Sequence, residues 1–142
     1  MIALNILIIA IFTGTYIIEC TPNDEELKHL IKRYNLECME QTKADPGFVE
    51  NIKNGDWKIP KEKMQGVKEW SLCMMTKAGL MTKEGVYQID VALAQVPTED
   101  KRNVEKLIDT CLSKKAIPPP DIALMFIKCY QKAKGNYTVT VL

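Results

Sequence analysis

The spacing of the cysteines constrains the fold of this chain more than any other feature of its 142 residues. The five cysteines are Cys20, Cys38, Cys73, Cys111 and Cys129, and no two of them form a C-x-x-C pair. Zinc sites usually draw on such close pairs or on several histidines, and this sequence has one histidine. The cysteines therefore predict disulfide bonds between distant segments and no metal site.

The first twenty residues, MIALNILIIAIFTGTYIIEC, have the profile of a secretory signal. They carry no charged side chain before Glu19. Their apolar run from Ile6 to Phe12 is shorter than the ~20 residues that a membrane-spanning helix needs. The polar stretch TPNDEELKH follows at once. We expect cleavage after Cys20, which separates a signal peptide at residues 1–20 from a secreted domain at residues 21–142. The alternative is a retained membrane anchor.

Cleavage would leave four cysteines, and an even number is typical of a disulfide framework in a small secreted domain. A catalytic thiol would leave an odd number for pairing, and Cys73 has no histidine near it in the sequence. Four cysteines allow three pairings, and the residues alone select none of them. Two disulfides are therefore expected, with their partners open at this point.

Apolar residues recur at helical spacing along almost the whole secreted domain, which predicts an all-α fold of about six helices. The expected helices run from Asp24 to Cys38, Pro46 to Ile52, Pro60 to Gly79, Val86 to Gln95, Thr98 to Leu112 and Asp121 to Gly135. The triple proline Pro118, Pro119 and Pro120 is expected to exclude helix and to impose a stiff, extended approach to the last one. Asp121 would then cap that helix.

The charged residues and motifs exclude several classes of function. Removal of Glu19 lowers the acidic count from 18 to 17 against 19 basic residues, and both signs are mixed along the chain. Such a distribution does not favour a nucleic-acid partner. The sequence has no G-x-S-x-G, no H-E-x-x-H and no phosphate-binding loop. We therefore predict no enzymatic activity, no catalytic residues and no cofactor.

The signal peptide, the six helices, the wide cysteine spacing and the segment GLMTKEGVYQIDVALAQVP at residues 79–97 together resemble the insect odorant-binding proteins. That pheromone- and general-odorant-binding family commonly has six cysteines, with three residues between the second and third and eight between the fifth and sixth. Counting back from Cys73 and Cys129 places the two missing cysteines at Glu69 and Pro120. The chain thus looks like the four-cysteine, or minus-C, branch of the family.

The resemblance also implies which cysteines pair. The two absent cysteines are partners in the family, so their joint loss leaves no orphan thiol. The implied bonds are Cys38–Cys73 and Cys111–Cys129. The implied fold is a compact helical bundle around a hydrophobic cavity, stapled by two disulfides.

The same resemblance implies a secreted carrier that binds odorants, pheromones or similar small hydrophobic molecules and transports them through aqueous lymph. The expected partners are a small apolar ligand and an olfactory receptor or sensory neuron membrane protein. The chain is expected to be a monomer or weak homodimer in sensillum lymph or another body fluid. The alternative is a secreted, disulfide-stapled helical signalling or interaction module, which would have a packed interior and an exposed apolar patch.

The candidate pocket residues are the apolar members of the helical stripes. Such residues are core by default, but flexible methionines suit variable partners, and a few tyrosine hydroxyls could orient a ligand. The predicted ligand-binding residues are Leu30, Ile31, Tyr34, Ile52, Met64, Val67, Met74, Met75, Ile89, Leu93, Leu107, Ile108, Leu112, Met125, Phe126 and Tyr130.

Three further features bear on how a ligand would be held. The missing bridge predicts a pocket wall that opens easily and therefore accepts a broad range of ligands. The only histidine, His29, is expected on the solvent side of the first helix, which does not favour histidine-driven release. In the tail, Asn136 begins an N-glycosylation sequon, and Val139, Val141 and Leu142 would either close over a cavity as a lid, join a partner surface or fray.

Overall fold

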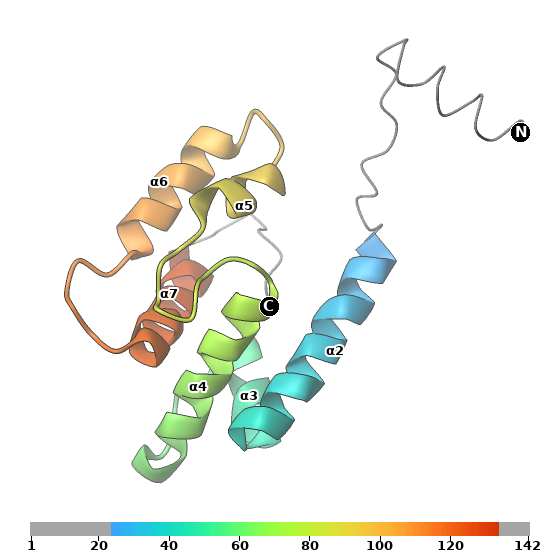
Figure 1. The fold of residues 1–142 in the computed structure, drawn as a ribbon, viewed down its shortest axis with the longest axis vertical. Helices are drawn as coiled ribbons and strands as arrows, with labels where there is room; N and C mark the ends of the chain where they lie inside the picture. The colour runs from blue at the N-terminus through green and yellow to red at the C-terminus, as the bar shows by residue number, and fades with distance from the viewer. Residues whose placement is uncertain (1–23, 134–142) are drawn as a thin grey trace, which may run out of the picture.

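The computed structural model describes residues 24–133, and within that range the chain forms six helices and no strand (Figure 1). The helices are α2 (Asp24–Thr42), α3 (Pro46–Lys53), α4 (Lys61–Lys77), α5 (Ile89–Ala94), α6 (Lys101–Cys111) and α7 (Pro119–Ala133). α4 is the central element, with α2 packed against it on one side and α7 on the other. α6 packs against α7, and α5 packs against α6. The prediction of an all-α fold stapled by two disulfides is confirmed.

Local sequence explains where the helices begin. Pro46 occupies the first turn of α3, and the carboxylate of Asp45 caps it by accepting a hydrogen bond of 2.9 Å from the backbone N–H of Gly47. Pro60 stands at the N-cap position of α4. The N–H groups of a first helical turn have no partner within the helix, so proline loses nothing there. Both prolines therefore mark helix starts, as expected.

The expectation for the triple proline is wrong in part. α7 begins at Pro119, so Pro119 and Pro120 lie inside its first turn and Asp121 is a helical residue rather than the cap. The missing N–H of proline is harmless in a first turn, and its fixed φ suits a helix. The carbonyl of Pro118 accepts hydrogen bonds from the N–H groups of Asp121 and Ile122 at 3.0 and 3.1 Å, which closes this turn.

α5 is shorter than the helix expected between Val86 and Gln95. The residues before it fold back on themselves, so that Met81 and Tyr87 pair in an isolated antiparallel bridge. Gly85, inside this 81–87 turn, has a φ of +87°, a conformation that favours glycine. The turn places the ring of Tyr87 against α7, which connects it to the interior described below.

Two disulfides and one buried hydrogen bond tie the helices together. Cys38–Cys73 joins α2 to α4, and Cys111–Cys129 joins α6 to α7. Trp70 of α4 is fully buried, and its indole Nε1 donates a 2.9 Å hydrogen bond to Oδ1 of Asn35 on α2. The carboxamide thus satisfies the one polar group of a large buried ring. α2 is therefore fixed to the rest of the molecule mainly through α4.

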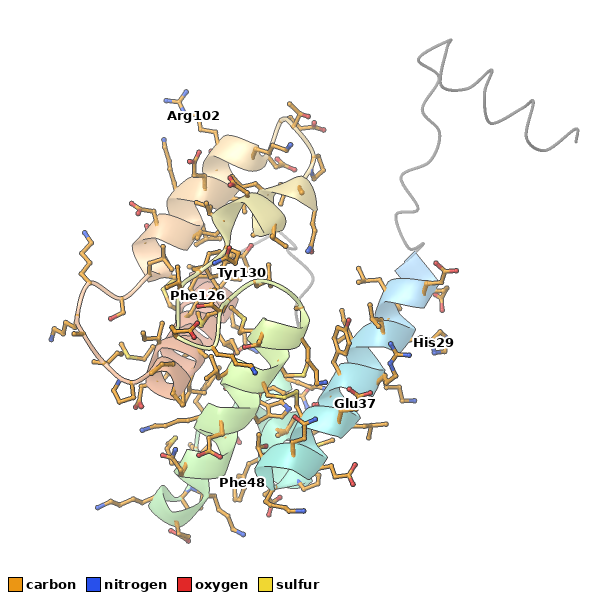
Figure 2. The ribbon with its side chains drawn as sticks, in the orientation of Figure 1. His29, Glu37, Phe48, Arg102, Phe126 and Tyr130 are labelled. Atoms are coloured by element: carbon orange, nitrogen blue, oxygen red, sulfur yellow. A yellow bond between two sulfur atoms is a disulfide. The ribbon has the colours of Figure 1, made fainter. Side chains whose placement is uncertain are left out.

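Some sequence predictions fall outside the described residues. These are the signal peptide at residues 1–20, the sequon at Asn136 and the tail residues Val139, Val141 and Leu142. None of the helices between residues 24 and 133 is long and apolar enough to cross a membrane. His29 is exposed on α2 and points away from the other helices (Figure 2), which agrees with its expected place in solvent.

Candidate ligand-binding site

A cleft of about 180 Å³ lies between the N-terminal half of α2 and the C-terminal end of α4. This α2–α4 cleft is lined by Leu27, Leu30, Ile31, Tyr34, Met74, Lys77, Ala78, Leu80 and Gln95. Its members from α2 follow an i, i+3, i+4, i+7 pattern, so the helix presents them on one face. Four of the lining residues belong to the predicted ligand-binding set, namely Leu30, Ile31, Tyr34 and Met74. The cleft is thus a mostly apolar hollow of the kind that binds small molecules.

The cleft carries a charge at one end, where α2 and α4 are joined by an ion pair. Nζ of Lys77 lies 2.8 Å from Oε2 of Glu37 and 5.9 Å from the centre of the Tyr34 ring. Glu37 lies on α2 about one turn beyond Tyr34, on the side of α2 that faces α4 (Figure 2). The hydrogen bond from Lys77 lowers the pKa of the Glu37 carboxyl, with a smaller contribution from the charge of Arg33. The Glu37 carboxyl is therefore ionised at neutral pH.

A second group of apolar residues fills the space between α4, α5, α6 and α7. The buried members of this interior cluster are Met75, Leu80, Met81, Ala92, Val96, Val104, Ile108, Cys111, Ala123, Phe126, Ile127 and Tyr130. Phe126 and Tyr130 come from neighbouring turns of α7 (Figure 2), and their ring centres are 5.7 Å apart. The Tyr87 ring lies 4.5 Å from Phe126, and burial raises the pKa of its hydroxyl. Leu80 belongs to this cluster and also lines the α2–α4 cleft, so the two groups are contiguous.

The predicted ligand-binding residues fall into these two groups with few exceptions. Besides the four in the cleft, eight lie in the interior cluster or against it: Met75, Ile108, Phe126, Tyr130, Ile89, Leu93, Leu107 and Leu112. Ile52 and Val67 are fully buried outside both groups, and Met64 is partly buried. The structure therefore divides twelve of the sixteen predicted residues between the cleft, with four, and the interior cluster, with eight.

Met125 belongs to neither group, because its side chain is 54 % exposed on α7. The buried face of α7 is displaced from the predicted stripe toward Ala123 and Ile127. These two residues are buried together with Phe126 and Tyr130, which gives the true i, i+3, i+4, i+7 face. Met125 is a larger hydrophobic residue than Ala123, so a prediction based on hydrophobicity alone chose Met125 for the buried face of α7, where Ala123 lies.

Sequence reasoning missed five of the residues that line the cleft: Leu27, Lys77, Ala78, Leu80 and Gln95. Leu27 precedes Leu30 by three residues and Ile31 by four, so it shares their helix face and could have been included on that ground. Lys77 follows Met74 by three residues, so it shares a helix face with a predicted pocket residue. Its charge argued against a place in the cleft lining, which only the packing of α2 against α4 shows.

The amino-acid sequence of the chain is similar to those of known proteins. A model of the PBP/GOBP family matches residues 21–133. Odorant-binding protein 10 of Aedes aegypti is 30% identical over 109 residues, which are 75% of this chain and 74% of that protein. General odorant-binding protein 69a of Drosophila melanogaster is 22% identical over 108 residues, 75% of this chain and 70% of that protein.

A solved structure shows the same arrangement of helices. It is described as a fatty acid binding protein, OBP56a, from the oral disk of the blowfly Phormia regina. It is 26% identical to this chain and superimposes with a TM-score of 0.62, covering 84% of this chain and 98% of its own. The family match covers most of the chain, and a relative at 30% identity supports it. The chain therefore belongs to the PBP/GOBP family of odorant-binding proteins.

Proposed function

We propose that this protein is a secreted carrier that binds a small hydrophobic molecule, an odorant, pheromone or similar semiochemical, and transports it through an aqueous body fluid. Membership of the odorant-binding protein family supports this function, and so does the structural relative from Phormia regina, which is described as a fatty acid binding protein. The observation that carries the proposal is the α2–α4 cleft, because it joins an apolar wall to a small number of polar groups.

The size and lining of the cleft suit a small and variable ligand. An engineered protein cavity of about 150 Å³ is large enough to bind benzene, so a cleft of about 180 Å³ holds at least one group of that size. Met74, which forms part of the wall, is flexible and polarisable and adapts to partners of different shape. Apolar burial in such a cleft supplies affinity without demanding one ligand.

A matched pair of leucine variants on α2 tests this proposal. Leu30 lines the cleft, whereas Leu36 is 57 % exposed on the same helix and does not line it. A fluorescent apolar probe that brightens out of water is titrated into the oxidised protein. We expect saturable binding near one probe per chain. We also expect roughly five- to tenfold weaker binding for Leu30→Ala, because buried leucine contact is lost. Leu36→Ala should bind as the parent protein does.

Two results would contradict the carrier function. One is the absence of saturable uptake by a folded monomer, which would favour the alternative of a signalling or interaction module with a packed interior. The other is equal loss in both leucine variants, which would place binding elsewhere. A panel of alcohols, esters, aldehydes and fatty acids, used as competitors, then measures how broad the ligand range is.

The proposal includes the place and the partners of the protein. We expect cells that express residues 1–142 to secrete a chain that begins at Thr21, which N-terminal sequencing of the secreted protein would show. Mass spectrometry of the same protein tests whether the sequon at Asn136 carries a glycan. The carrier would act as a monomer or weak homodimer, checked by sedimentation, and deliver its ligand to an olfactory receptor or sensory neuron membrane protein. A secreted chain that still carries residues 1–20 would contradict the signal peptide.

We also propose that the chain belongs to the four-cysteine branch, with Glu69 and Pro120 in place of the missing bridge. α4 and α7, which carry these positions, pack against each other. Nζ of Lys68 lies 2.6 Å from Oδ1 of Asp121, so the residues next to both positions already join the two helices. A charge pair at this place would do part of what the absent disulfide does in relatives with six cysteines.

Introducing cysteines at these two positions tests the alignment. The double variant Glu69→Cys with Pro120→Cys is expected to form a third disulfide and to raise the melting temperature, because the bond would close a loop of many residues in the unfolded chain. Mass spectrometry under non-reducing conditions detects the bond. Two free thiols in the folded variant would show that the positions are not adjacent and that the alignment is wrong.

A further inference from the structure

We propose that the α2–α4 cleft selects a short-chain carboxylate, whose head group replaces Glu37 on the ammonium of Lys77. This inference rests on the proposed carrier function and adds the chemical class of the ligand and the residue that recognises it. The proposed ligand is a monocarboxylic acid with an unbranched apolar chain. Its one negative charge is at one end, as is the positive charge of Lys77 in the cleft.

The distribution of charge in the cleft favours an anionic head. Among the residues that line it, Lys77 is the one ionised side chain, and the other eight are apolar, aromatic or amide groups. Lys77 lines the cleft, and its ammonium nitrogen lies 5.9 Å from the centre of the Tyr34 ring. An ammonium has three donors and no acceptor, so it attracts a carboxylate and repels an amine.

The bond that Lys77 already makes is suited to exchange. The side chain of Glu37 is 42% exposed, so this ion pair is partly screened by water and contributes little to stability. A ligand carboxylate offers Lys77 an equivalent partner and brings an apolar chain that is buried in the cleft. The head group therefore costs little to exchange, and the chain supplies the favourable free energy.

Glu37 has a second cation to turn to when it leaves Lys77. Nε of Arg33, one helical turn earlier on α2, lies 3.8 Å from Oε1 of Glu37. The displaced carboxylate keeps this neighbour and its contact with solvent, so no charge is left buried and unpaired. Arg33 thus makes the exchange between the internal and the external carboxylate easier.

The volume of the cleft limits the length of the chain. A hollow of about 180 Å³ is only slightly larger than one that binds benzene, so it encloses roughly six to eight carbon atoms. We choose octanoate as the probe, with 1-octanol and octylamine as competitors of equal chain length and different head group. Octanoate is ionised at neutral pH, because carboxylic acids of this kind lose their proton well below it.

The experiment measures displacement of the fluorescent probe by the three octyl compounds from the oxidised protein and its variants at neutral pH. Octanoate should bind more tightly than 1-octanol, and octylamine most weakly. Lys77→Met should weaken octanoate roughly tenfold and change 1-octanol less than twofold, because only the charged hydrogen bond is lost. Lys32→Met, an exposed lysine of α2 outside the cleft lining, is the control for the change in net charge.

Glu37→Gln distinguishes exchange from simple attraction. Removal of the competing carboxylate should strengthen octanoate binding roughly threefold and leave 1-octanol unchanged, because like-charge competition is lifted. Glu40→Gln, at an exposed position of α2, is its control. Circular dichroism verifies that each variant is folded. Because the expected effect of Glu37→Gln is a gain in affinity for octanoate, partial unfolding of the variant could not produce the same result.

The outcomes separate this inference from the function on which it rests. If the probe itself shows no saturable binding to the folded protein, the carrier function fails. If the probe binds and none of the octyl compounds displaces it, the carrier stands and the carboxylate site is wrong. If 1-octanol displaces it and octanoate is no tighter, or if Lys77→Met weakens both equally, the carrier stands and the carboxylate site is wrong. Weaker octanoate binding in Glu37→Gln would likewise overturn the exchange.

Discussion

Replacement of both Cys38 and Cys73 by alanine is expected to lower the free energy of unfolding by about 4 kcal/mol. The bond closes a separation of 35 residues, and the loss of its constraint on the unfolded chain accounts for that magnitude. Cys38 is fully buried in a cluster with Trp70 and Met74. Alanine is chosen as the replacement rather than serine, because a serine hydroxyl would be buried there without a hydrogen-bond partner. Urea unfolding followed by circular dichroism measures the change.

The second disulfide is the matched control. Replacement of Cys111 and Cys129 by alanine should cost about 3 kcal/mol, since the separation is 18 residues. The two double variants should lose similar amounts of stability, but the variant without Cys38–Cys73 should lose more affinity for the probe. Cys38–Cys73 fixes α2, one wall of the α2–α4 cleft, whereas Cys111–Cys129 joins α6 to α7 away from it. Equal loss of probe affinity in two folded variants would contradict the position of the site.

Gly85→Ala is expected to destabilise the protein by about 2–4 kcal/mol, for two reasons that add. The φ of +87° at Gly85 strains any residue with a side chain. A Cβ there would also lie 2.9 Å from Cδ1 of Ile122 and 3.3 Å from Cα of Pro119. The Ile122 methyl can move, but the backbone at the start of α7 cannot without shifting the helix. Thermal and urea unfolding measure the loss.

Gly55→Ala isolates the conformational part of this effect. Gly55 has a φ of +83°, nearly the same as Gly85, but a Cβ there would meet nothing within 4 Å. It should therefore cost about 1 kcal/mol. The difference between the two variants measures how tightly the 81–87 turn abuts α7. Equal costs at the two glycines would show that this contact does not constrain the fold.

The elements of the fold were accessible from the sequence because local rules determine them. Periodic apolar residues locate the six helices, and Pro46 and Pro60 mark two of their starts. Pro119 shows the limit of such rules, since proline both breaks helices and begins them, and the choice depends on the residues around it. Gly85 shows another limit, because its close approach to Ile122 is a tertiary contact that no local pattern contains.

The candidate site was accessible only in part. The α2 face of the cleft follows from the spacing of Leu30, Ile31 and Tyr34, but which helix that face meets depends on three-dimensional packing. Lys77 was missed because charged residues are usually on the surface, whereas here it lines the cleft and its ammonium pairs with Glu37 on the neighbouring helix. Apolar pattern therefore predicted the wall of the cleft, and the structure revealed its charged end.

An NMR titration with 1-octanol tests the central claim, that the α2–α4 cleft binds a small hydrophobic ligand. The neutral alcohol makes the result independent of the proposed role of Lys77. We predict saturable shifts near one ligand per chain, largest for the methyl groups of Leu30, Ile31 and Leu80 and the amide of Ala78, and absent from exposed Leu36. No saturable shift in the folded protein, or shifts confined to α3 or to the outer face of α6, would contradict the account.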